Sequence, residues 1–321
     1  MSILKNVHSI EAFLKLKFPD TTLVEGGLLH EKSRLIIAGD TGLGKSYLAL
    51  QVAWESALGL PWLGIWPIRR PLRTFLLQVE VAEPVFKERC RRLATGRGLP
   101  PNLDVLTMED FSLKDGAQSL TDTIAAGHYE LVVLDPLYMM HDGDENAVHT
   151  IRPTQRIVDE IRRELGTTFI FVHHVRKSMP GERPSINMLR GSSGWPGWVD
   201  TVLLATPGQE DTLRLHLLKA RNRQEALPHT AYALAWRKPG VFFEQVLEEE
   251  SDPNLGEIVA AIEQVGQDGV AKANRVVGFL VAKGWGRSRA YRGIAEMVEG
   301  GFIVKDGRDL RLSEKDGGKP G

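Results

Sequence analysis

Short apolar runs alternate with longer amphipathic stretches between residues 31 and 247. The apolar runs have the length of strands, and the stretches between them repeat their apolar residues with helical spacing. Strands are expected at 33–39, 74–80, 129–136, 167–174, 200–207 and 212–220, and helices at 45–59, 84–96 and 150–166. This alternation predicts an α/β domain over 31–247, with a mainly parallel sheet between helices and a hairpin formed by the last two strands.

A domain boundary is expected at 247–256, where acidic residues are mixed with Pro and Gly. Beyond it, residues 255–313 show three helical patterns and then two short strand patterns joined by Asp306 and Gly307, a pair that favours a tight hairpin. This order predicts a small winged-helix-like domain. Residues 1–30 are expected to form a lead-in to the first domain, and the polar residues 314–321 a disordered tail.

Composition narrows the class of protein. The hydrophobic share of 42% and the charged share of 25% are typical of globular proteins, and the net charge of −1 means that contacts with nucleic acid must come from local patches. The single cysteine, Cys90, excludes a disulfide framework and points to a reducing compartment. No apolar run is long enough to span a bilayer, and charges near the N-terminus argue against a secretory signal. We therefore expect a soluble cytoplasmic protein with no membrane partner.

The sequence GDTGLGKS, residues 39–46, fits the phosphate-binding pattern G-x-x-x-x-G-K-[ST]. An apolar run precedes it and a helical stretch follows, which is the context that this loop requires. Its backbone N–H groups close around phosphate oxygens, so side chains at the glycines would obstruct the turn. Lys45 is expected to reach the β- and γ-phosphates of ATP, and the Ser46 hydroxyl to ligate Mg²⁺. The expected ATP-binding residues are Gly39, Asp40, Thr41, Gly42, Leu43, Gly44, Lys45, Ser46 and Tyr47.

Carboxylates at strand ends are the candidates for metal binding and for activation of water. Asp135 follows four apolar residues at the carboxyl end of a strand, where ligands bind in open α/β sheets, and we expect it to be the second Mg²⁺ ligand. Glu80 ends another strand and is the candidate base. Glu83 precedes Pro84 and fits the start of a helix, where a carboxylate favours the helix dipole. Glu80 is therefore preferred to Glu83 as the base.

His173 and His174 end a further strand. No acidic or cysteine ligand stands nearby in the sequence with zinc spacing, so a metal-binding pair is not expected. A polar side chain at this strand end can contact the γ-phosphate and report its presence to the following loop. The pattern does not choose between the two histidines, and His174 is carried as the candidate sensor.

The apolar strand at 212–220 leads into two cations. With a two-residue period, the leucines at 213, 215 and 217 point to one face, and Lys219 and Arg221 follow on the same face. The simplest interpretation is that the strand leaves the core and that both cations lie in water. Any other interpretation needs a partner for them.

The order of these motifs resembles that of the RecA-like ATPases of the hexameric helicase branch, which are AAA-type P-loop NTPases. The motifs are the phosphate loop, the strand-end Glu, the strand-end Asp135, VHHVRK, RGSSGWPGWVD and KARN, and DENA at 144–147 also looks like that family's loop. RepA-type plasmid helicases look nearest, and DnaB-type replicative helicases are more distant. The resemblance covers about residues 25–225. It does not extend to a primase-binding domain, and GWPGW is not expected of a family member.

This resemblance implies an oligomer, a hexamer in that family, with each ATP site between two subunits. It also implies that a K-x-R pair on a late strand reaches the γ-phosphate bound by the neighbouring subunit. Lys219 and Arg221 match that pair. The candidate catalytic residues are therefore Lys45, Glu80, Asp135, His174, Lys219 and Arg221.

Further cations stand in the loop between His174 and Asp200, where they could line a central channel and contact the phosphates of single-stranded DNA. They are Arg176, Lys177, Arg183 and Arg190. The same loop contains Trp195 and Trp198. Stacking on bases and packing against a neighbouring subunit are both open for these tryptophans.

The C-terminal segment is locally basic. Residues 270–312 contain nine Lys or Arg and four Asp or Glu. Three of these cations, Arg287, Arg289 and Arg292, cluster at the start of the third predicted helix, the end that would enter a major groove. The local charge favours contact with duplex DNA over contact with a protein, which many winged helices make.

The leading hypothesis is an ATP-driven oligomeric motor that translocates on single-stranded DNA, such as a replicative-type helicase of a plasmid, phage or mobile element. The alternative is an ATP-gated DNA-binding loader or regulator that oligomerises without unwinding. A KaiC-like or recombination-mediator ATPase is a third hypothesis. The first two need the same phosphate site and the same K-x-R pair, so the sequence does not separate them.

Overall fold

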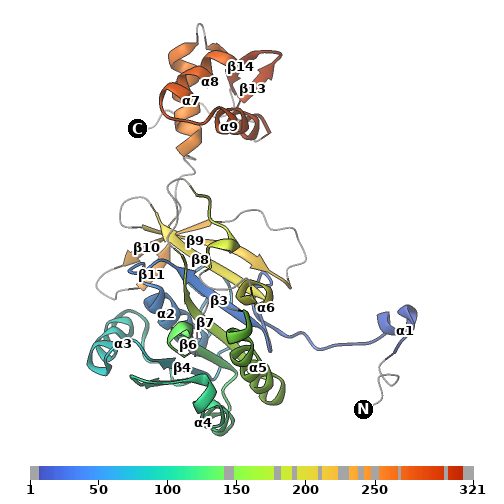
Figure 1. Cartoon of the computed structure of the whole chain (residues 1–321), viewed down its shortest axis with the longest axis vertical. Coiled ribbons are helices and arrows are strands. Elements are labelled where there is room, and N and C mark those ends of the chain that lie inside the picture. The colour runs from blue at the N-terminus through green and yellow to red at the C-terminus, as the bar shows by residue number, and fades with distance from the viewer. Residues whose placement is uncertain are drawn as a thin grey trace. The chain divides into compact units, whose positions relative to one another are not determined.

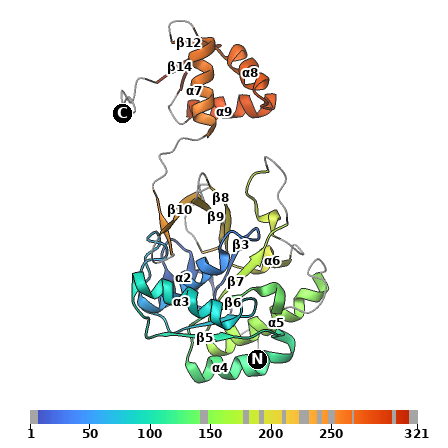
Figure 2. The same ribbon diagram turned by 90° about the vertical axis from the view of Figure 1, so that its left-hand side faces the viewer.

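The computed structural model describes residues 7–140, 148–176, 182–189, 194–208, 212–222, 231–237, 242–246, 253–266, 269–299 and 303–313. The chain divides into two compact units, Met1–Val246 and Leu247–Gly321. Figures 1 and 2 show their elements from two sides. No helix within the described ranges is long and apolar enough to cross a membrane.

The larger unit is built on a nine-stranded sheet in the order β11-β10-β9-β8-β3-β7-β6-β4-β5. Its strands are β3 (Arg34–Gly39), β4 (Thr74–Gln78), β5 (Leu103–Thr107), β6 (Leu131–Asp135), β7 (Thr168–His174), β8 (Thr201–Pro207), β9 (Thr212–Ala220), β10 (Ala231–Arg237) and β11 (Phe242–Gln245). The strands from β8 to β5 pair in parallel, and β9, β10 and β11 extend the sheet from β8 in antiparallel pairing. The sheet is therefore mixed. The sequence predicts its parallel core except β5, and of the antiparallel strands it predicts only β9.

Helices cover both faces of this sheet (Figure 1). On one face, α2 (Lys45–Leu58) and α3 (Glu83–Arg97) contribute apolar residues to a first core. On the other, α4 (Leu113–Gly127), α5 (Val148–Leu165) and α6 (Gly194–Trp198) contribute to a second core. Every residue of the central strands β3, β4 and β6 is buried, as expected for parallel strands covered on both sides.

Short elements complete the larger unit. They are α1 (Ile10–Leu14), the paired strands β1 (Thr22–Val24) and β2 (Leu29–His30), and single-turn helices at Leu137–Met140 and Ile186–Met188.

A β-bulge in β9 changes which face of the sheet its cations occupy. Leu203 of β8 pairs with Leu217, but the preceding residue, Val202, pairs with Lys219, so Leu218 is an extra residue in β9. Paired residues share a face and consecutive residues do not. Lys219 therefore lies with Val202 on the face of the second core, while Leu217 lies with Leu203 on the first. The prediction that Lys219 follows Leu217 on one face is wrong for this reason.

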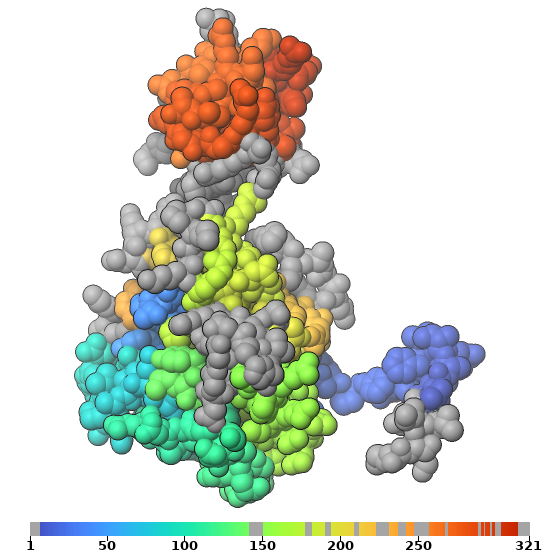
Figure 3. All heavy atoms as spheres, viewed as in Figure 1, coloured from blue at the N-terminus to red at the C-terminus, as the bar shows by residue number. Residues whose placement is uncertain are grey.

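The smaller unit consists of α7 (Pro253–Val265), β12 (Val270–Lys272), α8 (Ala273–Ala282), α9 (Arg287–Glu299), β13 (Ile303–Asp306) and β14 (Asp309–Leu312). Its strands form an antiparallel sheet in the order β12-β14-β13, and its helices share a core of their own (Figure 3, orange to red). Asp306 pairs with Asp309 across a tight turn in which Gly307 has a φ of 58°. This is the hairpin that the Asp-Gly pair predicts, whereas β12 is not predicted.

Candidate active site

The phosphate loop joins the end of β3 at Gly39 to the start of α2 at Lys45. Gly42 and Gly44 have φ values of 85° and 78°, which lie in the left-handed region that glycine adopts without strain. A side chain at Gly39 would bring its Cβ within 2.9 Å of the Ala205 carbonyl oxygen of β8. The loop geometry therefore requires glycine at these three positions, and the N-terminus of α2 points its free N–H groups toward the enclosed space.

Lys45 places a positive charge inside this loop. Its side chain is 6% exposed, and its Nζ donates a hydrogen bond of 2.8 Å to the Asp40 carbonyl oxygen. Burial lowers the pKa of Lys45, while the negative charges of Asp135, Glu80 and Asp40 oppose that shift. A buried ammonium group beside a helix N-terminus creates a site for an anion.

Asp135 ends β6 directly beneath the loop and is 1% exposed. The Ser46 hydroxyl donates to its Oδ1 at 3.2 Å. Burial raises the pKa of Asp135 to about 7, the charge of Glu80 raises it further, and the Ser46 hydrogen bond and the charges of Arg89 and Lys45 lower it. A hydroxyl and a carboxylate are the hard oxygen ligands that Mg²⁺ takes, together with phosphate oxygens and water. Ser46 and Asp135 therefore fit a magnesium ion bound with a nucleotide.

Glu80 and His174 line the same cavity as the phosphate loop. This cavity has a volume of about 320 Å³. Its lining residues are Thr41, Gly42, Gly44, Lys45, Ser46, Tyr47, Glu80, Val81, Arg89, Val172 and His174. Tyr138, in the single-turn helix after β6, donates to Glu80 Oε1 at 3.4 Å. Glu83 is the first residue of α3, as its position before Pro84 predicts.

The two histidines at the end of β7 point to opposite faces of the sheet. His174 lines the nucleotide cavity and packs edge-on against Tyr138, with ring centroids 4.8 Å apart. His173 is buried on the other face, where its ring lies 6.0 Å from that of Trp195. Of the two residues that the sequence leaves open, His174 is the one beside the phosphate loop.

Arg89 is a cavity residue that the sequence analysis missed. It lies in α3, and its guanidinium stacks over the ring of Tyr47 at 4.6 Å. A usable signal was present: Arg89 stands three residues after Phe86 and four before Leu93, the two residues that α3 buries. A cation on the apolar face of a helix that follows a strand-end carboxylate is a candidate ligand for phosphate.

Lys219 and Arg221 lie at the opposite edge of the sheet from their own phosphate loop. Ala220 pairs with Thr201 at the start of β8, whereas Gly39 pairs with Ala205, four residues and about 13 Å further along that strand. Both cations contact their own chain. Lys219 Nζ donates to the carbonyl oxygens of Pro196 and Val199, each at 2.7 Å. Arg221 donates to Asp200 Oδ1 at 2.8 Å and to the Gly197 carbonyl oxygen at 3.1 Å.

Trp195 and Trp198 pack in their own subunit. Trp195 is 1% exposed and belongs to the second core, with its ring 5.7 Å from that of Trp198. Trp198 lies under the guanidinium of Arg34, and its Nε1 donates to Asp159 Oδ2 at 3.0 Å. For Trp195, the expectations of base stacking and of packing on a neighbouring subunit are both wrong, because α6 is pinned to the sheet by its own core.

The predicted DNA contacts are only partly described. Arg176 donates to the carboxylate of Glu182, and Arg183 is exposed. Arg287 begins α9 in the smaller unit and is exposed, and for Arg289 and Arg292 in the same helix only the backbone is described. Lys177, Arg190 and the segment 144–147 lie outside the described residues.

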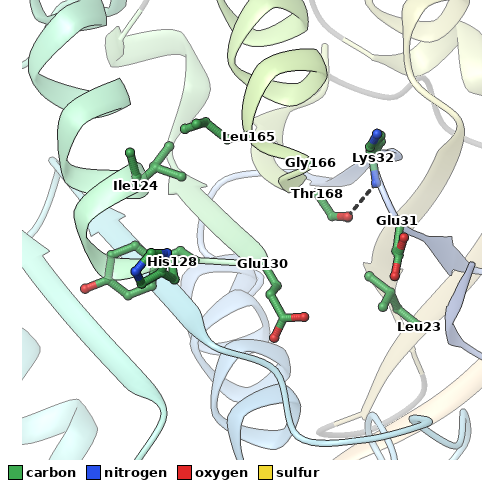
Figure 4. Close-up of a pocket in the computed structure, with 11 residues that line it drawn as sticks. Leu23, Glu31, Lys32, Ile124, His128, Glu130, Leu165, Gly166 and Thr168 are labelled. Atoms are coloured by element: carbon green, nitrogen blue, oxygen red, sulfur yellow. Dashed lines mark hydrogen bonds between the residues drawn. The ribbon is translucent and has the colours of Figure 1, made fainter.

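A second cavity, of about 500 Å³, opens at the edge of the sheet away from the phosphate loop (Figure 4). It is lined by side chains such as Leu23, Ile124 and Glu130, and the Lys32 N–H donates to Thr168 Oγ1 beside it at 2.9 Å. None of the predicted site residues lines this cavity. The smaller cavity carries the candidate chemistry.

Comparison with known proteins places the larger unit. The sequence matches the AAA domain family over residues 6–179, more than half of the chain. The chain belongs to the AAA domain family. It therefore contains a P-loop ATPase domain, for which nucleotide binding is the expected property. No curated protein matches the chain.

Among solved structures, the AAA domain of this chain is similar to the ATPase domain of another protein. The match has a TM-score of 0.53 at 15% sequence identity and covers 68% of this chain and 86% of that one. At this identity the likeness shows the fold, which is RecA-like, and the prediction of a RecA-like ATPase domain is confirmed at that level.

Proposed function

We propose that the chain is an ATP-hydrolysing motor that works as an oligomer on single-stranded DNA, and that it is a helicase related to the RepA type. The observation that carries the proposal is the cavity in which Lys45, Ser46 and Glu80 meet above the buried Asp135. A loader or regulator that binds DNA under ATP control without unwinding it remains the alternative. Both need this site.

Within the site, each side chain has a role that its position supports. The loop N–H groups and Lys45 bind the phosphates of ATP, and Ser46 and Asp135 hold Mg²⁺, which neutralises charge on the β- and γ-phosphates. Glu80 lines the cavity at its exposed side, where it orients the attacking water. His174 contacts the γ-phosphate region from β7, and Arg89 adds a positive charge from α3.

Lys219 and Arg221 act on the site of a neighbouring subunit. Their distance from the phosphate loop of their own chain, about 13 Å along β8, excludes action in cis without a large rearrangement. An arginine inserted from a second subunit stabilises charge that develops in the transition state and makes hydrolysis depend on assembly. In the single chain Arg221 is bound to Asp200, so this role requires that contact to be exchanged on assembly.

DNA contacts are proposed for both units. Arg176, Lys177, Arg183 and Arg190 follow β7, whose end carries His174, so the loop that holds them is attached to the nucleotide site. We assign the smaller unit to the winged-helix class, because its elements follow the order helix, strand, helix, helix, hairpin. Arg287 at the start of α9 supports contact with duplex DNA through that helix.

A strand-displacement assay on a forked DNA duplex tests this proposal. The full chain with ATP and Mg²⁺ is expected to release the displaced strand, and Lys45→Ala, prepared in the same way, is not. Hydrolysis stimulated by single-stranded DNA without strand release would favour the loader or regulator. Absence of ATP hydrolysis, with and without DNA, would refute both functions.

A further inference from the structure

Gln78 is buried at the nucleotide site with its side-chain amide unsatisfied. It is 0% exposed, and neither Nε2 nor Oε1 has a hydrogen-bond partner among the described residues. Buried amides in folded proteins are nearly always hydrogen-bonded, because an unpaired one loses its bonds to water and gains nothing in return. An amide with both ends unpaired implies that something outside the polypeptide satisfies it.

The position of Gln78 indicates what that is. It is the last residue of β4 and pairs in register with Asp135, the last residue of β6. Neighbouring strands lie about 4.8 Å apart. Gln78 follows Leu76 by two residues, and Asp135 follows Val133 by two, and both of these apolar residues belong to the core under α2 and α3. The side chains of Gln78 and Asp135 therefore point to the same face of the sheet, side by side.

A second unsatisfied group comes from the helix that covers this face. Arg89 of α3 has a buried Nε without a hydrogen-bond partner in the described part of the chain, and its charge acts on Asp135. An amide, a guanidinium nitrogen and a carboxylate offer both donors and acceptors to a small polar occupant. Buried water occupies such places when it finds two to four polar partners.

We propose that Gln78 is a positioning residue for the divalent-cation subsite: through ordered water, its amide orients the carboxylate of Asp135 and binds the hydration shell of the ion. The proposal rests on the proposed ATPase function. Mg²⁺ keeps several of its waters when it binds through one carboxylate and phosphate oxygens. Groups that hold those waters and the ligating carboxylate are part of the site, although they never touch the metal.

A purely structural role makes a different prediction. If Gln78 only fills space between β4 and α3, an apolar residue of the same volume would serve as well, and replacing an unsatisfied amide would stabilise the fold without changing metal affinity. Gln78→Met is therefore the informative substitution, because methionine keeps the length of the side chain and removes both polar atoms. Thr74→Val is a matched control, since Thr74 is buried on the same strand and the same face, four residues from Gln78.

The experiment measures Mn²⁺ binding to the full chain saturated with ADP, read from the electron paramagnetic resonance signal of free Mn²⁺ and corrected for Mn²⁺ held by free ADP. Mn²⁺ replaces Mg²⁺ at oxygen-ligand sites. Gln78→Met is expected to weaken Mn²⁺ binding about tenfold or more, the effect found for groups that orient metal ligands. Affinity for a fluorescent ADP analogue in EDTA should stay unchanged, which shows that the site is still folded. Thr74→Val should match the wild type in both measurements.

The outcomes separate the two proposals. Mn²⁺ affinity within twofold of the wild type in Gln78→Met would overturn the role of Gln78 and leave the ATPase assignment intact. A wild-type chain that binds neither the ADP analogue nor Mn²⁺ with ADP would overturn both. Gln78→Leu serves if Gln78→Met does not fold, with the same expected loss and the same criterion.

Discussion

The two edges of the nine-stranded sheet hold their charged residues in opposite ways. At the phosphate-loop edge, Lys45 donates to a backbone carbonyl, Ser46 reaches Asp135 at 3.2 Å, and the amide of Gln78 has no partner among the described residues. At the other edge, Arg34 donates to Asp200 and to Asp159. One edge is incomplete without a ligand, and the other is complete within the chain.

This difference separates chemistry from stability. A buried charge without a matched partner costs free energy, so a fold that keeps several of them at one place is expected to recover that cost when a ligand binds. Buried ion pairs with complete hydrogen bonds instead fix one arrangement of the elements that carry them. Arg221 belongs to the complete edge in the single chain, yet it is about half exposed, with 48% of its side chain accessible. It is the group through which the complete edge of one subunit is proposed to serve the incomplete edge of another.

The largest expected effect is the loss of ATP turnover in Lys45→Ala. This substitution removes the cation from the incomplete edge, and nothing else in the phosphate loop replaces its charge. Turnover should fall to the background of the assay, while the circular dichroism spectrum and the thermal midpoint stay close to those of the wild type. Retained turnover at the wild-type rate would remove the phosphate loop from the mechanism.

Arg221→Ala should come next, with a loss of about a thousandfold in turnover, the effect of removing an arginine finger from phosphoryl transfer. Affinity for ATP should change only modestly, because the residue acts on a neighbour's site in the transition state. Wild-type turnover in Arg221→Ala would refute the finger and leave Asp200 as its only partner. Full activity from a chain that stays monomeric at all concentrations tested would refute it as well.

Complementation between the two variants sharpens this prediction. Lys45→Ala subunits keep Arg221, and Arg221→Ala subunits keep their phosphate loop. Mixed oligomers contain some interfaces with both halves intact, so the ATPase activity of the mixture should exceed the sum of the separate samples. The comparison assumes that hydrolysis at one interface does not need a fully intact oligomer.

Arg34→Met tests the complete edge by its stability. The substitution leaves Asp200 and Asp159 without their buried partner, and breaking a buried pair in this way costs about 3 to 5 kcal/mol. The free energy of unfolding, measured with urea, should fall by that amount, whereas ATP affinity should not change because Arg34 lies at the far end of β3 from the phosphate loop. Weakened ATP binding with unchanged stability would contradict the division between the edges.

Glu80→Gln is expected to slow hydrolysis about a hundredfold, the smaller range for a positioned base, with ATP binding unchanged. Glu83→Gln is the matched control, because Glu83 is also a carboxylate after β4 but begins α3. Single-turnover measurements separate the chemical step from product release. Slow hydrolysis in Glu83→Gln, with Glu80→Gln active, would show that the other carboxylate is the base.

Local pattern and strand alternation predict the incomplete edge well. The phosphate loop is a contiguous motif, and parallel strands bring their carboxyl ends to one edge, so Glu80, Asp135 and His174 could be expected to meet there. Gln78 and Arg89 could not be placed in the same way. Their role follows from contact between α3 and the face of the sheet, which no spacing in the sequence states.

The complete edge is less predictable because it depends on single-residue events. One extra residue, Leu218, moves Lys219 to the other face, and a two-residue period cannot detect a bulge before it occurs. The strands β10 and β11 lack the continuous apolar run of a central strand, so the pattern passes over them. α4 was also missed, although Ser112 caps its N-terminus and Asp115 stands three residues later, which is a helix-start signal.

Trp198→Phe is the smallest effect that still tests the comparison. Phenylalanine keeps an aromatic face under Arg34 but removes the indole N–H, whose bond to Asp159 is 3.0 Å long. A hydrogen bond to a charged group contributes about 2 kcal/mol, so the free energy of unfolding should fall by about that much. Affinity for single-stranded DNA in the presence of an ATP analogue should stay the same, because the indole N–H is used inside the chain. A drop in DNA affinity with unchanged stability would place Trp198 on the DNA and make the second edge a ligand site too.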